Sequence, residues 1–310
     1  MSLVASSQAY LGAMVGAVVG DAAGAPFERE IAYEPYLLNG LFREIDYLPY
    51  TDDTHMTIGI AESLLKCGQI YGAHMASVFA RNFAHEPWRG YAEGPPQVLF
   101  YIVNGPHWEQ ASRALFNNSG SYGNGGAIRV APVVLVSTDL DDVATLAHRT
   151  ALITHAHELG IKGAVLQDCS VALALDSKNI GEGQFHETLG RYAFTDIYKK
   201  KLDSLGNLLS AGAGVGIEQV VNELSNGVQA LESVPTAIFC FLRRPTFRMR
   251  PLRPWPERRH GYYCQHDWSH CRGLTWSGCD SPTVDRGRVG GGSNDGVGQL
   301  NVPEIPLKWV

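Results

Sequence analysis

The sequence predicts an all-α domain followed by an irregular C-terminal tail. Apolar residues recur with the 3.6-residue period of a helix in several segments, whereas the alternating pattern of strands is scarce. From about Arg243 this periodicity stops, and arginines arrive among prolines, followed by a glycine-rich stretch. We therefore expect a helical domain over residues 1–243 and a tail over residues 244–310. The periodic segments are 54–68, 142–156, 161–175, 201–212 and 217–233.

An apolar stretch over residues 11–26 predicts the first helix. It does not match a secretion signal, because no Lys or Arg precedes it. It is also too short and too rich in glycine to span a membrane. Gly12, Gly16 and Gly20 recur every four residues, which places them on one face of the helix. We expect a buried helix with a close neighbour on that face.

Local signals predict where other helices begin and end. Thr138 and Asp141 fit a capping box before the apolar run that starts at Val143. Gly68 and Gly160 stand where helices are expected to stop, since glycine readily adopts the backbone conformation of a helix C-terminus. The stretches 31–50 and 84–96 lack periodicity and predict long loops, which often carry functional sites on a helical scaffold.

The composition restricts the class of function. A chain of 310 residues with 45% hydrophobic residues can bury a large core, as one domain or two. With 25 Lys and Arg against 31 Asp and Glu, the net charge of -6 argues against direct binding to DNA or to an anionic membrane. Cys67, Cys169 and Cys240 lie far apart in apolar surroundings, which is typical of reduced thiols in an intracellular protein.

The segment YTDDTHM, residues 50–56, is a candidate metal site. Thr51, Asp52 and Asp53 offer a hydroxyl and two adjacent carboxylates directly before a helix. Hard oxygen atoms suit Mg²⁺ or Mn²⁺, and a cation would relieve the repulsion between neighbouring carboxylates. The alternative is an ordinary helix N-cap, which needs only one such side chain.

The glycine-rich segment GSYGNGGAIRVAP, residues 120–132, is a candidate anion site. Its glycines allow backbone N–H groups to converge on a phosphate at the start of a helix. The alternative is an Asn-Gly turn without a ligand, and the segment lacks the Gly-Lys-Ser/Thr ending of a P-loop. Further along, THAHELG presents His155, which taken alone fits a buried core imidazole better than a ligand contact.

Together these segments resemble one enzyme family. GAVVGDAAGAPFE (residues 16–28), YTDDT, GSYGNGGAIRVAP and THAHELGIKGAVLQ follow one another in the order and spacing of the ADP-ribosylglycohydrolase (dinitrogenase reductase-activating glycohydrolase) family. The resemblance runs from about residue 8 to Arg243. SYGNGGAIR, RGYAEG and ALESVPTAIFCFL are most similar to the branch that removes ADP-ribose from serine and degrades poly(ADP-ribose) and O-acetyl-ADP-ribose.

The resemblance implies a compact orthogonal helix bundle with two Mg²⁺ ions beneath the distal ribose. Thr51, Asp52 and Asp53 match the first metal motif, and Asp52 also matches a substrate contact. Glu28 matches an acidic residue that contacts a metal and is the favoured acid–base catalyst. The remaining substrate contacts match Ser119, Gly120, Ser121, Tyr122, Gly123, Asn124, Gly125, His155 and Val228.

The same resemblance sets expectations for partners and location. The expected partners are ADP-ribosylated proteins, poly(ADP-ribose) or O-acetyl-ADP-ribose, bound by a monomer without direct DNA binding or membrane attachment. We expect an intracellular protein of the DNA damage response in the cytoplasm and nucleus, with the mitochondrial matrix as a further compartment. The alternative is a noncatalytic ADP-ribose-binding protein.

The segment RRHGYYCQHDWSHCRGLTW, residues 258–276, raises a separate question. It crowds four thiol and imidazole side chains together like the ligands of a zinc ion. Zinc sites usually set two pairs of ligands a dozen or more residues apart, and this segment does not. The four side chains are Cys264, His266, His270 and Cys271.

A shift of the reading frame explains this segment better than zinc. The family completes its metal centre with a C-terminal Gly-Gly-Asp-Thr-Asp-Thr and a helix, and this chain has no such string. Read one nucleotide later, the codons of residues 260–273 permit Thr-Asp-Thr-Ile-Ala-Asn-Met-Thr-Gly-Ala-Ile-Ala-Gly-Ala. Arg259, Gly261 and Tyr262 then stand in place of Asp, Asp and Thr, so we expect a frame-shifted tail and impaired catalysis.

Overall fold

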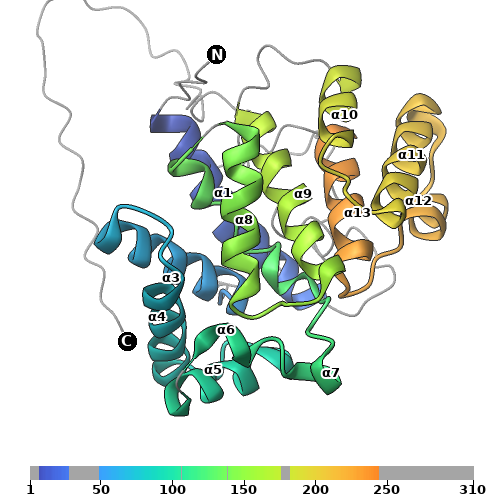
Figure 1. The fold of residues 1–310 in the computed structure, drawn as a ribbon. Helices are drawn as coiled ribbons and strands as arrows, with labels where there is room; N and C mark the ends of the chain where they lie inside the picture. The colour runs from blue at the N-terminus through green and yellow to red at the C-terminus, as the bar shows by residue number, and fades with distance from the viewer. Residues whose placement is uncertain (1–6, 28–48, 106, 138, 176–181, 244–310) are drawn as a thin grey trace, which may run out of the picture.

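The computed structural model describes residues 7–27, 49–105, 107–137, 139–175 and 182–243, and these form an all-α fold (Figure 1). No strand occurs within these ranges. Gly123 and Gln229 form an isolated antiparallel β-bridge. The prediction of an all-α protein is confirmed. The predicted tail over residues 244–310 lies outside the described residues.

The helices α8 and α9 run side by side through the middle of the molecule (Figure 1). The helices α3 to α7 lie on one side of this pair, and α10 to α13 lie on the other. The elements are α1 (Ser7–Gly24), η1 (Ala25–Phe27), α3 (Asp52–Cys67), α4 (Gly72–His85), α5 (Gly94–Asn104), α6 (Trp108–Ala111), α7 (Leu115–Asn118), η2 (Asn124–Gly126), η3 (Val133–Leu135), α8 (Leu140–Leu152), α9 (Glu158–Leu175), α10 (Glu182–Gly190), α11 (Asp196–Ser210), η4 (Gly212–Gly214), α12 (Ile217–Leu224) and α13 (Ala230–Arg243).

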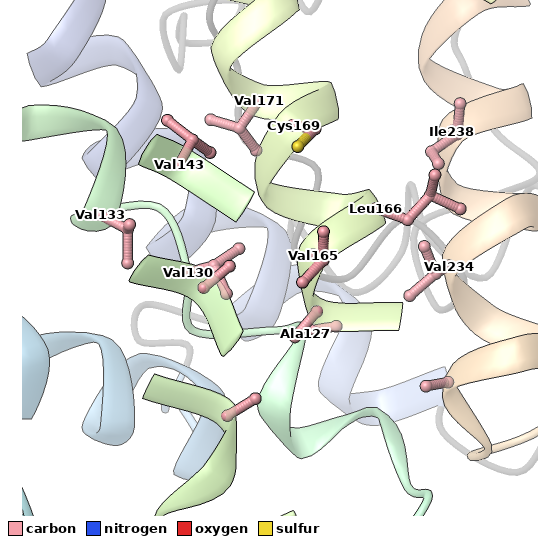
Figure 2. Packing of buried hydrophobic residues seen from close by; sticks show 14 of the residues in the cluster. Ala127, Val130, Val133, Val143, Val165, Leu166, Cys169, Val171, Val234 and Ile238 are labelled. Carbon is pink, nitrogen blue, oxygen red and sulfur yellow. The ribbon is translucent and has the colours of Figure 1, made fainter. Parts of the chain in front are cut away.

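The core is built around α9, which is buried on all of its faces from Gly163 to Ala174. Figure 2 shows its side chains reaching in different directions: Val165 lies near Ala127, and Leu166 points toward Ile238 of α13. Burial of apolar side chains is the main favourable contribution to folding, so a helix covered all round holds its neighbours in place. The N-terminal turn of α9 is thereby fixed in position.

The predicted helix boundaries are partly confirmed. Gly68 ends α3 in the left-handed conformation with φ 68°, and its N–H donates to the carbonyl of Leu64. Gly160 does not end a helix, because it lies in the first turn of α9. The N-cap of α8 is Asp139, whose carboxylate accepts from the amides of Asp141 and Asp142, while Thr138 of the predicted capping box lies outside the described residues. Aspartate is a favoured N-cap residue, because its carboxylate accepts hydrogen bonds from the free amides of the first helical turn.

Two other predictions need correction. The periodic segment 217–233 is not one helix, because the chain leaves α12 at Ser225 with φ 70° and starts α13 at Ala230. The close neighbour expected along the glycine face of the first helix is absent at Gly20, where a Cβ would meet no heavy atom of the described structure within 4 Å. None of the described helices is long and apolar enough to cross a membrane.

The contact between α9 and its neighbours leads to a stability prediction at Gly163. A Cβ at this position would lie 2.6 Å from the Cβ of Ala230 and would also meet the Tyr198 hydroxyl. Gly163→Ala should therefore push α13 and α11 away and lower the free energy of unfolding by about 1–3 kcal/mol. Gly183→Ala in α10 is the matched control, because no heavy atom lies within 4 Å of its Cβ position. Urea unfolding measures the free energy of unfolding of both variants. Equal values for Gly163→Ala and Gly183→Ala would contradict the close packing at Gly163.

Candidate active site

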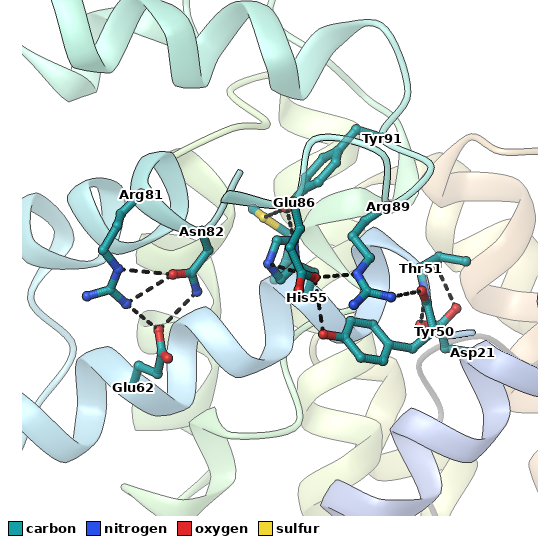
Figure 3. A network of polar contacts seen from close by, with 11 residues as sticks. Asp21, Tyr50, Thr51, His55, Glu62, Arg81, Asn82, Glu86, Arg89 and Tyr91 are labelled. Atoms are coloured by element: carbon teal, nitrogen blue, oxygen red, sulfur yellow. Dashed lines mark hydrogen bonds and ion pairs between the residues drawn. The ribbon is translucent and has the colours of Figure 1, made fainter. Parts of the chain in front are cut away.

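The first turn of α3 is held by Asp21, which reaches it from α1 (Figure 3). The Asp21 carboxylate accepts the Thr51 amide at 2.8 Å, the Thr54 amide at 3.1 Å and the Thr51 hydroxyl at 2.6 Å. Thr51 is also the N-cap, since its Oγ1 accepts from the amide of Asp53 at 3.4 Å. The cap interpretation of Thr51 is therefore confirmed, and a second carboxylate supports it from another helix.

A polar network packs beside this helix end (Figure 3). The Arg89 guanidinium donates to Glu86 at 2.5 Å and to the Tyr50 carbonyl at 3.3 Å, and it lies 3.7 Å from the centre of the Tyr50 ring. Burial lowers the pKa of His55, although the nearby Glu86 carboxylate acts in the opposite direction. His55 Nδ1 is 2.9 Å from the Tyr91 hydroxyl. The network fixes the loop of residues 86–93 against the start of α3.

The glycine-rich loop of residues 119–125 packs on the beginning of α9. The His157 amide donates to the Ser121 carbonyl at 3.3 Å, and a Cβ at Gly160 would lie 2.8 Å from that same oxygen. Gly120 has φ 73°, and a Cβ there would lie 2.6 Å from the His157 nitrogen. A glycine is therefore required at Gly120 both for the left-handed backbone and for the close approach.

The backbone just before this loop is strained. Phe116, Asn117 and Asn118 have φ angles of 50°, 58° and 67°, the left-handed region that residues other than glycine rarely adopt. Each such residue costs on the order of 1 kcal/mol, and such residues gather at functional sites. The strain supports a functional reading of the adjoining loop over an incidental Asn-Gly turn.

The far edge of the loop is tied to the segment before α13. The Asn124 amide donates to the Val228 carbonyl at 2.9 Å, and the Ala230 amide donates to the Tyr122 carbonyl at 3.0 Å. These bonds place Val228, which is 76% exposed, next to the loop. The Tyr122 ring is also exposed and makes an edge contact with His157. The structure thus brings Val228, the loop and the His155 region together.

Some of the loop amides are already bonded and others are not. The Gly123 amide donates to Ser121 Oγ, and the Asn124 amide is used by Val228. The amides of Ser121 and Tyr122 donate to no group in the described part of the chain. Only part of the loop can therefore offer backbone amides to an anion. The two available amides lie beside the N-terminal end of α9, where the helix dipole favours an anion.

His155 is a buried, neutral imidazole beneath the loop. Its side chain is 3% exposed, its Nδ1 lies 2.8 Å from Thr154 Oγ1, and a Cβ at Gly125 would lie 2.7 Å from its ring. Burial lowers the pKa of His155 to about 3, and the Arg129 cation acts in the same direction. His155 is therefore a ring on which the loop rests, and it is uncharged at neutral pH.

Arg129 lies between the loop and the head of α3. It is completely buried, its Nη2 donates to the Thr150 carbonyl at 2.8 Å, and its guanidinium lies 4.9 Å from the centre of the Phe79 ring. Burial lowers the pKa of Arg129 to about 9, while Tyr91 and Asp52 act in the opposite direction. This cation is near both His155 and Asp52, so it links the two candidate halves of the site electrostatically.

The oxygen atoms at the head of α3 fit a hard divalent cation. They comprise the Thr51 hydroxyl and the carboxylates of Asp52 and Asp53. The Thr54 hydroxyl in the same turn is buried and has no hydrogen-bond partner in the described part of the chain. Such donors are those that Mg²⁺ prefers. No group of three His, Cys, Asp or Glu side chains gathers around a common point within the described ranges. A full coordination shell would therefore need water or further ligands.

Two predicted sites cannot be placed. Glu28 and the four zinc-like side chains of residues 264–271 lie outside the described residues. Sequence reasoning also missed two buried charges, Asp21 and Arg129. The sequence did contain a signal for Asp21, because it is the one charged residue in the helix α1.

Comparisons with known proteins give a consistent result. The sequence pattern of the family described as ADP-ribosylglycohydrolase matches residues 4–252. ADP-ribosylhydrolase ARH3 of Homo sapiens is 35% identical over 268 residues, covering 76% of this chain and 73% of that protein. ADP-ribosylhydrolase ARH3 of Danio rerio is 32% identical over 328 residues, covering 97% of this chain and 85% of that protein.

A solved structure of an ADP-ribosylglycohydrolase-related protein complex has a similar fold. It superposes with a TM-score of 0.52 and 23% sequence identity, over 76% of this chain and 75% of that chain. At this identity the likeness concerns the fold alone, and it confirms the helical architecture predicted from the sequence.

The buried imidazole gives a pH-dependent stability prediction. His155 is neutral in the folded state down to about pH 3 but becomes protonated near pH 6.5 when unfolded, so stability falls as the pH falls through this window. His155→Gln should remove this contribution, which amounts to as much as about 1.4 kcal/mol per pH unit. Urea unfolding between pH 4.5 and 7.5 would measure how the free energy of unfolding changes with pH in the unaltered protein and in His155→Gln. Identical slopes would contradict a neutral buried ring.

Proposed function

This chain belongs to the ADP-ribosylglycohydrolase family, and from that membership we propose that it is a Mg²⁺-dependent hydrolase of O-glycosidic ADP-ribose bonds. The proposed substrates are serine-linked ADP-ribose, poly(ADP-ribose) and O-acetyl-ADP-ribose. The observation that carries the proposal is the loop of residues 119–125, supported by the start of α9 and linked through Arg129 to the acidic head of α3. An anion site thus adjoins a cation site.

The loop would bind the diphosphate of ADP-ribose. The available amides of Ser121 and Tyr122 can donate to phosphate oxygens, and the positive end of the α9 dipole lies behind them. The neutral His155 ring keeps the loop in this shape, because Gly125 packs directly on it. The buried Arg129 cation adds a favourable potential without occupying the site itself.

The exposed surface beside the loop would accept the adenine base. The ring of Tyr122 is 42% exposed. Val228 is held beside the same loop by the hydrogen bonds that join its segment to Tyr122 and Asn124. An aromatic face stacks favourably on a base, and an apolar side chain covers its edge. Such an arrangement would bind adenosine through stacking and apolar contact as well as through hydrogen bonds.

The hydrolysis would take place at the head of α3. Thr51, Asp52 and Asp53 would hold Mg²⁺ together with Glu28, which lies outside the described residues. When bound, Mg²⁺ would hold ribose hydroxyls and polarise the attacking water. The water oxygen bonds to the anomeric carbon as the bond to the serine oxygen breaks. Glu28 takes the proton from the water and returns one to the leaving oxygen.

A noncatalytic ADP-ribose-binding protein is the second candidate. It is favoured by the sequence, which keeps the glycine-rich loop and His155 but lacks the C-terminal Gly-Gly-Asp-Thr-Asp-Thr that completes the family's metal centre. Such a protein would bind ADP-ribose through the loop and leave the glycosidic bond intact.

We also propose the domain division and the surroundings expected from the sequence. Residues 1–243 would form the helical domain, and residues 244–310 would be a frame-shifted tail that lacks the second metal motif. The protein would act as an intracellular monomer. Sequencing of the transcript across residues 242–276 tests the frame directly, because one extra or missing nucleotide would restore the motif.

The substrate proposal predicts release of ADP-ribose from a serine-modified peptide in the presence of Mg²⁺. The assay compares the 310-residue chain with a version whose residues after 243 follow the shifted frame, and we expect faster release by the second version because its metal ligands are complete. Calorimetry with ADP-ribose runs alongside. Binding without release in either version would replace the hydrolase by the noncatalytic candidate.

The cation site predicts large losses on removal of either carboxylate. In the version whose residues after 243 follow the shifted frame, Asp52→Ala and Asp53→Ala should each lower kcat/KM at least about 100-fold, because each removes an oxygen ligand. Asp142→Ala is the matched control, since it also removes an aspartate from the first turn of a helix, α8, away from the site. If all three variants kept full Mg²⁺-dependent activity, the carboxylates would serve only to stabilise the helix end.

A further inference from the structure

Asp21 is placed to do more than stabilise a helix end. It is 2% exposed and is the sole charged residue of α1. A buried carboxylate is costly unless it is fully hydrogen bonded. All three of its described bonds go to one short segment, the Thr51 amide, the Thr51 hydroxyl and the Thr54 amide. The burial therefore serves the turn that carries Asp52 and Asp53.

The bond to the Thr51 hydroxyl has a fixed direction. A carboxylate can only accept, so the single hydroxyl proton of Thr51 must point toward Asp21 at 2.6 Å. Within the described residues, the Thr51 oxygen accepts only the long 3.4 Å bond from the Asp53 amide. A hydroxyl that donates to a carboxylate becomes more electron-rich at oxygen and thus a better ligand for a cation.

We propose that Asp21 is a positioning residue of the cation site, which directs the Thr51 proton inward so that an oxygen lone pair of Thr51 faces the cation. The inference rests on the proposed function, because it assumes that Thr51 is a ligand. Asp21 also anchors the start of α3 through two backbone amides, which holds the neighbouring carboxylates in a fixed relation to Thr51. Asp21 acts through Thr51 and does not itself contact the cation.

A purely structural role for Asp21 has a counterpart in the same molecule. Asp139 stabilises the start of α8 by accepting the amides of Asp141 and Asp142, each at 3.1 Å. It accepts no threonine hydroxyl in the described structure. Asp139 thus accepts two backbone amides, as Asp21 does, but no threonine hydroxyl. Asp139→Asn therefore measures how much the loss of a helix-capping carboxylate alone changes cation affinity.

The test is Mn²⁺ binding by the full chain, measured by calorimetry at up to millimolar Mn²⁺. In Asp21→Asn the amide oxygen can still accept the two backbone amides, while the amide nitrogen donates to Thr51 and reverses that bond. We expect at least a tenfold loss of Mn²⁺ affinity with an unchanged far-UV circular dichroism spectrum. Asp139→Asn should change the affinity less than twofold. Equal affinity of Asp21→Asn and the unaltered chain overturns the proposal.

A double-mutant cycle separates action through Thr51 from a general disturbance. Thr51→Val removes the hydroxyl, so adding Asp21→Asn to it should lower the affinity less than twofold further. Two full and additive losses would overturn the proposal. If Asp21→Asn does not fold, Asp21→Ser takes its place, with at least a fivefold loss expected and equal affinity overturning the idea. Absence of Mn²⁺ binding by the unaltered chain would overturn the proposed cation site itself, which is a distinguishable result.

Discussion

Burial of α9 on every side is the constraint on which the rest of the structure depends. A helix covered all round needs neighbours around its whole circumference, and α8, α13, α10 and α1 supply them (Figure 1). With the helix body fixed, its first turn becomes a rigid platform. The loop of residues 119–125 packs on that platform at Gly160, so the shape of the candidate anion site follows from the packing of the core.

Hydrophobic periodicity predicted several of the core helices but not α4, which has 14 residues, nor the shorter α5 and α10. The segments that became α3, α8, α9 and α11 carry enough apolar positions to reveal their period. The helices α5 and α10 were not foreseen, since they are short and their packing is decided by neighbours distant in sequence. The break at Ser225 was also missed, although the Asn226-Gly227 pair that follows it is typical of a turn.

The candidate site shows the same division between local and distant information. The oxygen-rich turn of Thr51, Asp52 and Asp53 and the glycine loop are contiguous in sequence, so their residue types alone indicate their chemistry. The contacts that organise them are not contiguous: Asp21 reaches Thr51 across 30 positions, and Arg129 acts on Asp52 from the other half of the site. Such pairs follow from tertiary packing, which a single sequence does not state.

The bridge between Gly123 and Gln229 has a consequence for how the protein is made. It joins the loop to a segment about a hundred residues later, so the loop cannot reach its final shape until that segment has been synthesised. At typical elongation rates this delay lasts on the order of 5–20 s. A nascent chain would thus contain the segments of α1 to α12 before its loop could recognise a nucleotide, so ligand binding would come late in its maturation.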